Sequence, residues 1–133
     1  MTSEIELGPI VPILRIFDIA KAKEFYLDFL GFTWDWEHQF EPTLPIYAQV
    51  SRAGLTLHLS EHHGDGAPGS HITIQTKGVV AFHRELTEKM YRYARPGLED
   101  QPWGARTVTV TDPFANRLTF SESSDSSTAM SAI

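Results

Sequence analysis

The sequence predicts an α+β fold made of two successive βαβββ modules. Each half of the chain opens with a strand candidate, continues with an amphipathic helix and ends with three further strand candidates. A glycine-rich connector over residues 61–70 separates the two halves. The strand candidates alternate apolar and polar side chains, a pattern typical of sheets that bury one face. We therefore assign module one to residues 9–62 and module two to residues 69–122.

Module one begins with a strand that we expect over residues 10–17. Asp18 is a suitable N-cap for a helix over residues 19–30, and Gly31 occupies the position just after the helix end. The apolar side chains at helical spacing, which we expect to face the core, are Ala22, Phe25, Tyr26, Phe29 and Leu30. The strands that follow are expected over residues 32–39, 46–51 and 55–60.

Module two repeats this plan, with a strand over residues 71–76 and a helix over residues 79–94. The apolar stripe predicted for this helix consists of Val79, Phe82, Leu86, Met90 and Tyr93. The segment from Asp112 to Asn116 has the composition of a tight turn between the last two strands. The last three strands are expected near residues 97–101, over 106–111 and over 116–122. We expect the polar tail, residues 123–133, to be disordered.

Length and composition indicate a single globular domain over residues 1–122. The 133 residues are 41% hydrophobic and 21% charged, and they include no cysteine, which excludes disulfides and thiolate ligands. The formal net charge of −6 argues against nucleic-acid binding. Because there is no long apolar run and no signal-peptide pattern, we expect a cytoplasmic protein with no membrane partner.

Strand alternation places a row of polar side chains on one face of each predicted sheet. The candidate binding residues on these faces are Thr56, His58, His71, Gln75 and Thr119. Such a face is either a solvated surface or the lining of a ligand cleft, and alternation alone leaves both interpretations open.

Three histidines and a glutamate lie close together in residues 58–63. His62 and His63 belong to the connector, where we expect a solvated loop; the alternative is that they shape the rim of a cleft or form a dimer contact. His58 and His71 lie on predicted strands and are better candidates for hydrogen bonds to a ligand, with a purely structural role as the alternative. Two histidines alone make a weak metal site, because divalent metals usually require further donors such as a carboxylate.

The tryptophans suggest that a planar ligand is bound by stacking, although core packing is the alternative for each ring. Trp34 and Trp36 alternate along one strand, so we expect them to share a face with Phe32. Trp103 lies in a Pro-Trp-Gly turn of module two. The charged residues nearby leave the charge of the ligand open, since both signs occur among Asp35, Glu37, Arg15 and Arg117.

Three segments carry a resemblance to a known family. VPILRIFDIAKAKEFYLDFLGF combines an opening strand, an aspartate turn and a helix that ends in Leu-Gly-Phe. PWGARTVTVTDPFANRLTF combines a Trp-Gly turn with a closing hairpin, and LHLSEHHGDGAPGS lies between them. In this order the segments resemble the vicinal-oxygen-chelate superfamily, which includes glyoxalase I, extradiol dioxygenases and bleomycin-resistance proteins. The middle segment is similar to the bleomycin-resistance branch in particular, and the whole resemblance covers residues 10–122.

The resemblance implies that the paired modules form a curled mixed sheet around a cleft, and that a homodimer completes each cleft. Metal enzymes of the superfamily place one ligand on the first and last strand of each module. The corresponding positions here are Val11, His58, His71 and Thr119. Valine has no donor atom and threonine offers a neutral hydroxyl, so only the two histidines match.

The resemblance implies one of two functions. The first is binding and sequestration of a bulky antibiotic such as bleomycin, or of a related planar metabolite, without metal, cofactor or catalytic residue. The second is a metal-dependent lyase, isomerase or dioxygenase, in which His58 and His71 hold a divalent metal together with Glu61, Glu122 or water. We favour the first function. Its expected ligand-binding residues are Trp34, Trp36, Tyr47, Thr56, His58, His71, Gln75, Trp103 and Thr119.

Overall fold

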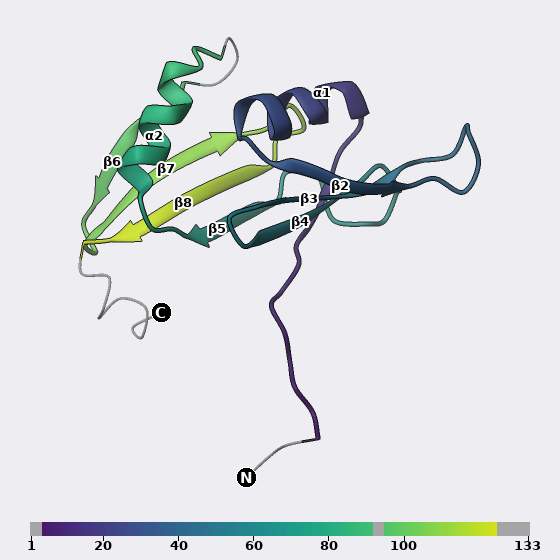
Figure 1. The fold of residues 1–133 in the computed structure, drawn as a ribbon, viewed down its shortest axis with the longest axis horizontal. Helices are drawn as coiled ribbons and strands as arrows, with labels where there is room; N and C mark the ends of the chain where they lie inside the picture. Colours follow the sequence, from purple (N-terminus) through teal and green to yellow (C-terminus); the bar gives the residue numbers. More distant parts are fainter. Residues whose placement is uncertain (1–3, 92–94, 125–133) are drawn as a thin grey trace.

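The computed structural model, which describes residues 4–91 and 95–124, contains two four-stranded sheets with helices packed on one side (Figure 1). Module one consists of β1 (Ile13–Arg15), α1 (Ile19–Lys23), the π-helical turn η1 (Glu24–Phe29), β2 (Thr33–His38), β3 (Tyr47–Arg52) and β4 (Leu55–Ser60). Module two consists of β5 (His71–Gln75), α2 (Val79–Glu88), β6 (Leu98–Gln101), β7 (Ala105–Thr111) and β8 (Arg117–Ser123). The predicted order of two βαβββ modules is confirmed.

The two sheets have the same topology. In each sheet the first strand pairs in parallel with the last strand of its module, giving the orders β1-β4-β3-β2 and β5-β8-β7-β6. The remaining strand pairs are antiparallel, and neither sheet closes on itself, in agreement with the predicted α+β class. β4 covers the expected residues 55–60, whereas β1 is shorter than the strand expected over residues 10–17. Pro12 precedes β1 and has no amide hydrogen for a ladder bond.

The first helix begins where the sequence predicts but changes its geometry after one turn. Asp18 caps the helix by accepting a hydrogen bond from the Lys21 amide at 3.0 Å. In its second half the helix widens, and the Leu30 amide bonds to the Phe25 carbonyl five residues back. Gly31 ends the helix with φ at +76°, which glycine adopts without a side-chain clash. The expectation of one regular α-helix over residues 19–30 is therefore wrong for the second half.

Both modules contribute to one hydrophobic core. The buried side chains of α1, η1 and the following turn are the five predicted from helical spacing: Ala22, Phe25, Tyr26, Phe29 and Leu30. The apolar faces of the strands contribute, among others, Leu14, Leu57, Leu59, Leu118 and Phe120. Because this cluster draws on both sheets, burial of apolar surface holds the two modules against each other.

A buried polar network also joins the modules. The Asp112 carboxylate, in the turn between β7 and β8, accepts a hydrogen bond from the Tyr26 hydroxyl at 2.7 Å. The amides of Phe114 and Asn116 donate to the same carboxylate, each at 2.8 Å. The Asn116 side chain donates to Asp112 at 2.9 Å and to the Arg15 carbonyl of module one at 2.8 Å. Burial raises the pKa of Asp112 and that of Tyr26. The predicted turn is confirmed, and it also fastens module two to module one.

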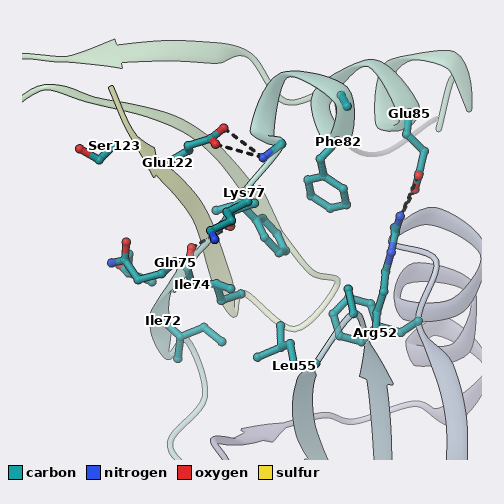
Figure 2. Close-up of a pocket in the computed structure, with 18 of the residues that line it drawn as sticks. Arg52, Leu55, Ile72, Ile74, Gln75, Lys77, Phe82, Glu85, Glu122 and Ser123 are labelled. Atoms are coloured by element: carbon teal, nitrogen blue, oxygen red, sulfur yellow. Dashed lines mark hydrogen bonds and ion pairs between the residues drawn. The ribbon is translucent and has the colours of Figure 1, made fainter. Parts of the chain in front are cut away.

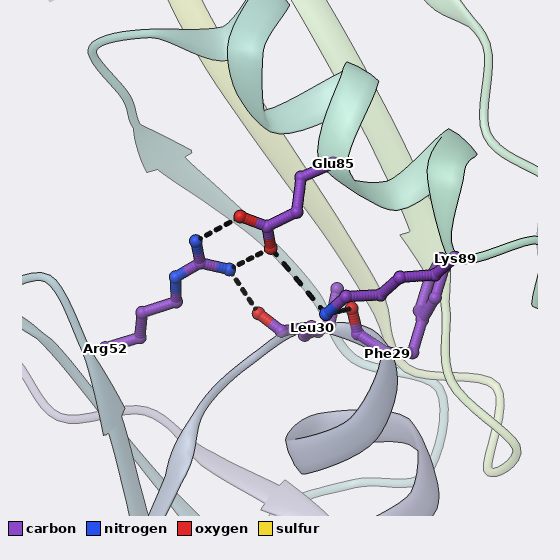
Figure 3. Close-up of polar contacts among 5 residues, drawn as sticks. All are labelled: Phe29, Leu30, Arg52, Glu85 and Lys89. Carbon is purple, nitrogen blue, oxygen red and sulfur yellow. Dashed lines mark hydrogen bonds and ion pairs between the residues drawn. The ribbon is translucent and has the colours of Figure 1, made fainter.

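A second set of polar contacts lies at the end of η1, as Figure 3 shows. Arg52 donates to the Leu30 carbonyl at 2.6 Å, and Lys89 donates to the Phe29 carbonyl at 2.7 Å. These cations stabilise the carbonyl end of the helix, which carries a partial negative charge. Arg52 also forms two hydrogen bonds with Glu85 of α2, at 2.7 and 2.8 Å, and this pairing lowers the pKa of Glu85.

Two boundaries in module two differ from the expectation. α2 ends at Glu88 rather than at residue 94, because Met90 adopts a left-handed conformation with φ at +50°. Met90 is 70% exposed, so its predicted place in the core is wrong, and Tyr93 lies outside the described residues. β8 extends to Ser123, and the rest of the predicted tail beyond residue 124 also lies outside them. In the described part of the chain, no helix has the length and apolar character needed to span a bilayer.

Candidate functional site

The polar face of the first sheet brings aromatic and polar side chains together. Strand register places Gln49 of β3 opposite both His58 of β4 and Trp36 of β2. The rings of Trp36 and Tyr47 are stacked, with centroids 6.2 Å apart and planes at 15°. The His58 ring meets both edge-on, at 5.4 Å from Trp36 and 5.1 Å from Tyr47. Thr56 lies on the same face of β4, two residues before His58.

A β-bulge separates the two tryptophans that we expected on one face. The pairing of β2 with β3 shifts at Asp35, so that Trp34 lies opposite Val50 and Trp36 lies opposite Gln49. Consecutive residues of β3 point to opposite faces, so Trp34 lies on the core side and Trp36 on the polar side. In agreement, Trp34 packs against the core cluster. The expectation of a shared face is wrong because Asp35 is an extra residue in the ladder.

Hydrogen bonds connect the side chains of this face in a line. The Tyr47 hydroxyl lies 2.7 Å from Nδ1 of His58, and Nε2 of His58 lies 3.0 Å from Oε1 of Gln49. The Gln49 amide nitrogen donates to Asp35 at 3.1 Å. The bulge makes this last contact possible, because it sets both Asp35 and Trp36 opposite Gln49. Sequence reasoning missed Gln49, although its two-residue spacing from Tyr47 indicates that both side chains share a face.

A cavity of about 680 Å³ opens beside this cluster. Its lining consists of Trp36, Glu37, His38, Phe40, Tyr47, His62 and Asp65. The Ser60 hydroxyl holds the connector in place by donating to Asp65 at 2.9 Å and accepting from the His62 amide at 3.0 Å. His62 is half-buried at the cavity rim, which was the alternative interpretation, whereas His63 is exposed as expected of a solvated loop. Burial and the charge of Asp65 raise the pKa of Tyr47.

The second sheet carries a separate polar face. Nε2 of His71 lies 2.8 Å from the Thr119 hydroxyl, which in turn bonds a threonine hydroxyl of β7 at 2.9 Å. His71 and Gln75 are exposed on β5, and Trp103 is 73% exposed in the turn between β6 and β7. In the part of the chain that the structure describes, the hydrogen bonds of His71 stay within this sheet, as those of His58 stay within the first.

The donor set of the described residues does not fit a divalent metal. His58 uses both ring nitrogens in hydrogen bonds on the first sheet, whereas His71 belongs to the second sheet. Val11 has no donor atom. Glu61 accepts a backbone amide at 3.0 Å, and Glu122 accepts the amides at the start of α2, which lower its pKa. Across residues 4–91 and 95–124, no three His, Cys, Asp or Glu side chains are placed to hold a metal ion.

A larger cavity of about 1090 Å³ lies on the helix-covered side, where the two modules meet (Figure 2). The Arg52–Glu85 pair lies at one side of this cavity. Of the predicted ligand-binding residues, Gln75 lines it. The main apolar side chains of its lining are Leu55, Ile72, Ile74, Phe82 and Phe120. Most of the candidate binding residues lie away from this cavity, on the polar faces of the two sheets.

Solved structures with the same fold include proteins that bind antibiotics. A bleomycin-binding protein from Streptomyces verticillus, complexed with copper(II)-bleomycin, has 25% sequence identity and a TM-score of 0.66, covering 87% of this chain and 96% of its own. TnmS3, an antibiotic binding protein from Streptomyces sp. CB03234, has 23% identity and a TM-score of 0.70, covering 90% and 99%. A further bleomycin-binding protein, complexed with bleomycin, has 20% identity and a TM-score of 0.68, covering 87% and 98%.

The family assignment rests on a separate comparison. No curated protein matches the chain. A family model described as glyoxalase superfamily protein matches residues 1–127, which include both modules and both polar faces. The chain therefore belongs to the glyoxalase superfamily, as its sequence motifs implied.

Proposed function

We propose that this protein binds and sequesters a bulky antibiotic such as bleomycin, or a related planar metabolite, without making or breaking a covalent bond. The observation that carries the proposal is the stacked pair of Trp36 and Tyr47 beside a cavity of about 680 Å³. Aromatic walls combined with a few polar groups are typical of sites for planar ligands. The similar solved structures include two bleomycin-binding proteins and an antibiotic binding protein, which supports this class of ligand.

The proposed contacts come from the polar faces of both sheets. On the first sheet the ligand stacks on Trp36 and Tyr47 and meets the polar side chains beside them. Trp34 faces the core, so we propose that it supports the strand behind Trp36 rather than touching the ligand. The remaining proposed contacts are Thr56 and His58 on the first sheet and His71, Gln75, Trp103 and Thr119 in module two.

A second subunit supplies the missing wall in this proposal. A drug-sized ligand usually buries most of its surface in its binding site. The polar face of one open sheet covers a planar ligand from one side only. Ile13 lies on the polar side of β1, opposite His58, and Val11 precedes the strand. These side chains are 38% and 39% exposed, so the edge of this face offers apolar surface to a partner. We therefore propose a homodimer in which the second sheet of one subunit closes the cleft formed by the first sheet of its partner.

The proposed binding requires no metal from the protein. His58 forms hydrogen bonds with Tyr47 and Gln49, and His71 forms one with Thr119. A metal would have to break these hydrogen bonds, and among the described residues no group of three His, Cys, Asp or Glu side chains is placed to hold it. Binding by stacking and hydrogen bonding leaves the hydrogen bonds of His58 and His71 in place. The side chains therefore need little rearrangement when the ligand binds.

Isothermal titration calorimetry tests this proposal directly. Metal-free bleomycin, added to protein kept in excess chelator, is expected to bind with a dissociation constant of about 1 μM or lower and with one ligand per chain. Such an affinity is needed because capture lowers the free drug only when the protein concentration exceeds the dissociation constant. The absence of any binding heat, or binding that appears only after a metal is loaded onto the protein, would contradict the proposal. Sedimentation of the protein as a monomer at micromolar concentration would contradict the shared cleft.

A further inference from the structure

The side chains on the polar face of the first sheet determine the positions of their own protons. A carboxylate only accepts hydrogen bonds, so Asp35 requires the amide nitrogen of Gln49 to point toward it, at 3.1 Å. The amide oxygen of Gln49 then faces Nε2 of His58 at 3.0 Å, and this oxygen also only accepts. His58 must therefore carry its proton on Nε2.

The other ring nitrogen of a neutral His58 can only accept a hydrogen bond. This nitrogen, Nδ1, lies 2.7 Å from the Tyr47 hydroxyl, so Tyr47 donates its proton to His58. The phenolic oxygen keeps acceptor lone pairs, and Tyr47 lines the 680 Å³ cavity. Because Tyr47 donates its hydroxyl proton to His58, its oxygen can only accept a hydrogen bond from a ligand in the cavity.

We propose that Tyr47 selects ligands that donate an N–H or O–H hydrogen bond, and that Asp35 sets this preference through Gln49 and His58. The inference rests on the proposed function and names the chemical class of ligand that the site takes. Tyr47 contacts the ligand, whereas Asp35 is a positioning residue, because it is bonded to Gln49 and does not line the cavity.

The remaining lining of the cavity favours the same class of ligand. The described residues that line it include Glu37 and Asp65 and no lysine or arginine, so its fully charged groups are hydrogen-bond acceptors. The Tyr47 hydroxyl is protonated at neutral pH, since burial and Asp65 raise its already high pKa further, and it can therefore donate to His58. A planar cation that carries N–H groups offers both the ring surface for Trp36 and the donor for Tyr47.

Nitrogen-15 NMR of the histidine side chains at pH 8 tests the proton positions without any ligand. Wild-type His58, whose signals are identified by their loss in His58→Ala, is expected to show a protonated Nε2 and an unprotonated Nδ1. Asp35→Lys replaces the acceptor by a donor, so the Gln49 amide turns round and the pattern on His58 reverses. Asp35→Glu keeps an acceptor and retains the wild-type pattern. A protonated Nδ1 in the wild type, or an unchanged pattern in Asp35→Lys, overturns the inference.

Two acridines test the selection itself by calorimetric titration. 9-Aminoacridine and 10-methylacridinium are planar cations of equal charge and similar size, but only the first has N–H donors. Wild-type protein is expected to bind 9-aminoacridine about tenfold more tightly, the effect of roughly one hydrogen bond. Tyr47→Phe and Asp35→Lys lose this preference, and Asp35→Glu keeps it. The ratio of the two affinities is the readout because a change of protein charge affects both cations alike.

The outcomes separate this inference from the proposed function. Equal affinity of the wild type for the two acridines overturns the inference and leaves the proposed stacking site intact. Retention of the preference in Tyr47→Phe also overturns it, because the acceptor would then lie elsewhere. If neither acridine binds and bleomycin does not bind either, the proposed function fails, and the inference fails with it.

Discussion

Replacing Asp112 with alanine is expected to lower the free energy of unfolding by about 3 kcal/mol at pH 7. The substitution removes the acceptor that the Tyr26 hydroxyl and the Phe114 and Asn116 amides share. Tyr26 is fully buried, so its hydroxyl would be left without water or another partner. Urea denaturation followed by circular dichroism measures the change, because the free energy of unfolding falls linearly with denaturant.

Asp100→Ala is the matched control for this prediction. Asp100 forms a salt bridge with Arg106, but its side chain is 76% exposed, so its loss is expected to change stability by less than about 0.5 kcal/mol. Burial raises the pKa of Asp112 in the folded state, and such a carboxyl contributes most below its unfolded pKa and less as pH rises through the folded value. The deficit of Asp112→Ala is therefore expected to be larger at pH 4 than at pH 7. Equal stability of the two variants would show that Asp112 does not join the modules.

Replacing Trp36 with alanine is expected to weaken bleomycin binding about 30-fold, or about 2 kcal/mol. The substitution removes one ring of the stacked pair and opens the wall of the cavity beside Tyr47. Trp36 is 43% exposed, so its loss is expected to affect folding far less than binding. Calorimetric titration measures the affinity, and urea denaturation confirms that the variant is folded.

Trp36→Phe provides the matched variant for this prediction. Phenylalanine keeps an aromatic face at the same position, so the variant is expected to retain most of the affinity that Trp36→Ala loses. If both variants bind bleomycin as the wild type does, the ligand lies elsewhere on the molecule. If both lose binding to the same extent, stacking on the ring is not the source of the affinity.

Local patterns in the sequence were sufficient to predict most of the fold. Asp18 caps the first helix because its side chain offers an acceptor to a free amide, a property of the residue and its position alone. The strand over residues 55–60 was predicted with its exact bounds because apolar and polar side chains alternate throughout it. The turn at Asp112 was likewise predictable, since Asp, Pro and Asn all favour turns. Its hydrogen bond to Tyr26 was not, because these residues are 86 positions apart.

The features that the sequence did not reveal depend on pairing between strands. The alternation around Trp34 and Trp36 continues through Asp35 without interruption, and the bulge is visible only in the register with β3. The same register brings Asp35 to Gln49 and thereby creates the line of hydrogen bonds that ends at Tyr47. Periodicity also extended α2 beyond its true end, because it does not record the left-handed conformation that Met90 adopts just after the helix.

The candidate site was predicted as a set of residue types rather than as one arrangement. Tyr47, His58 and Trp36 were expected as ligand-binding residues, and the structure brings their rings together on one sheet face. His71 and Thr119 were expected in the same set of ligand-binding residues, and the structure shows that they contact each other on the second sheet. Sequence alternation indicates which face each side chain takes, yet it does not place one sheet relative to another.

An NMR titration of the tryptophan indole N–H signals with metal-free bleomycin shows whether the ligand binds on Trp36. The chain has three tryptophans, so each indole reports on a different place: the core side of β2, the polar face of the first sheet and the β6–β7 turn. We expect the Trp36 signal to shift most and the Trp34 signal to shift least, while the Trp103 signal reports whether module two contributes to the cleft. A saturating ligand that shifts Trp34 and leaves Trp36 unchanged would contradict the proposed site.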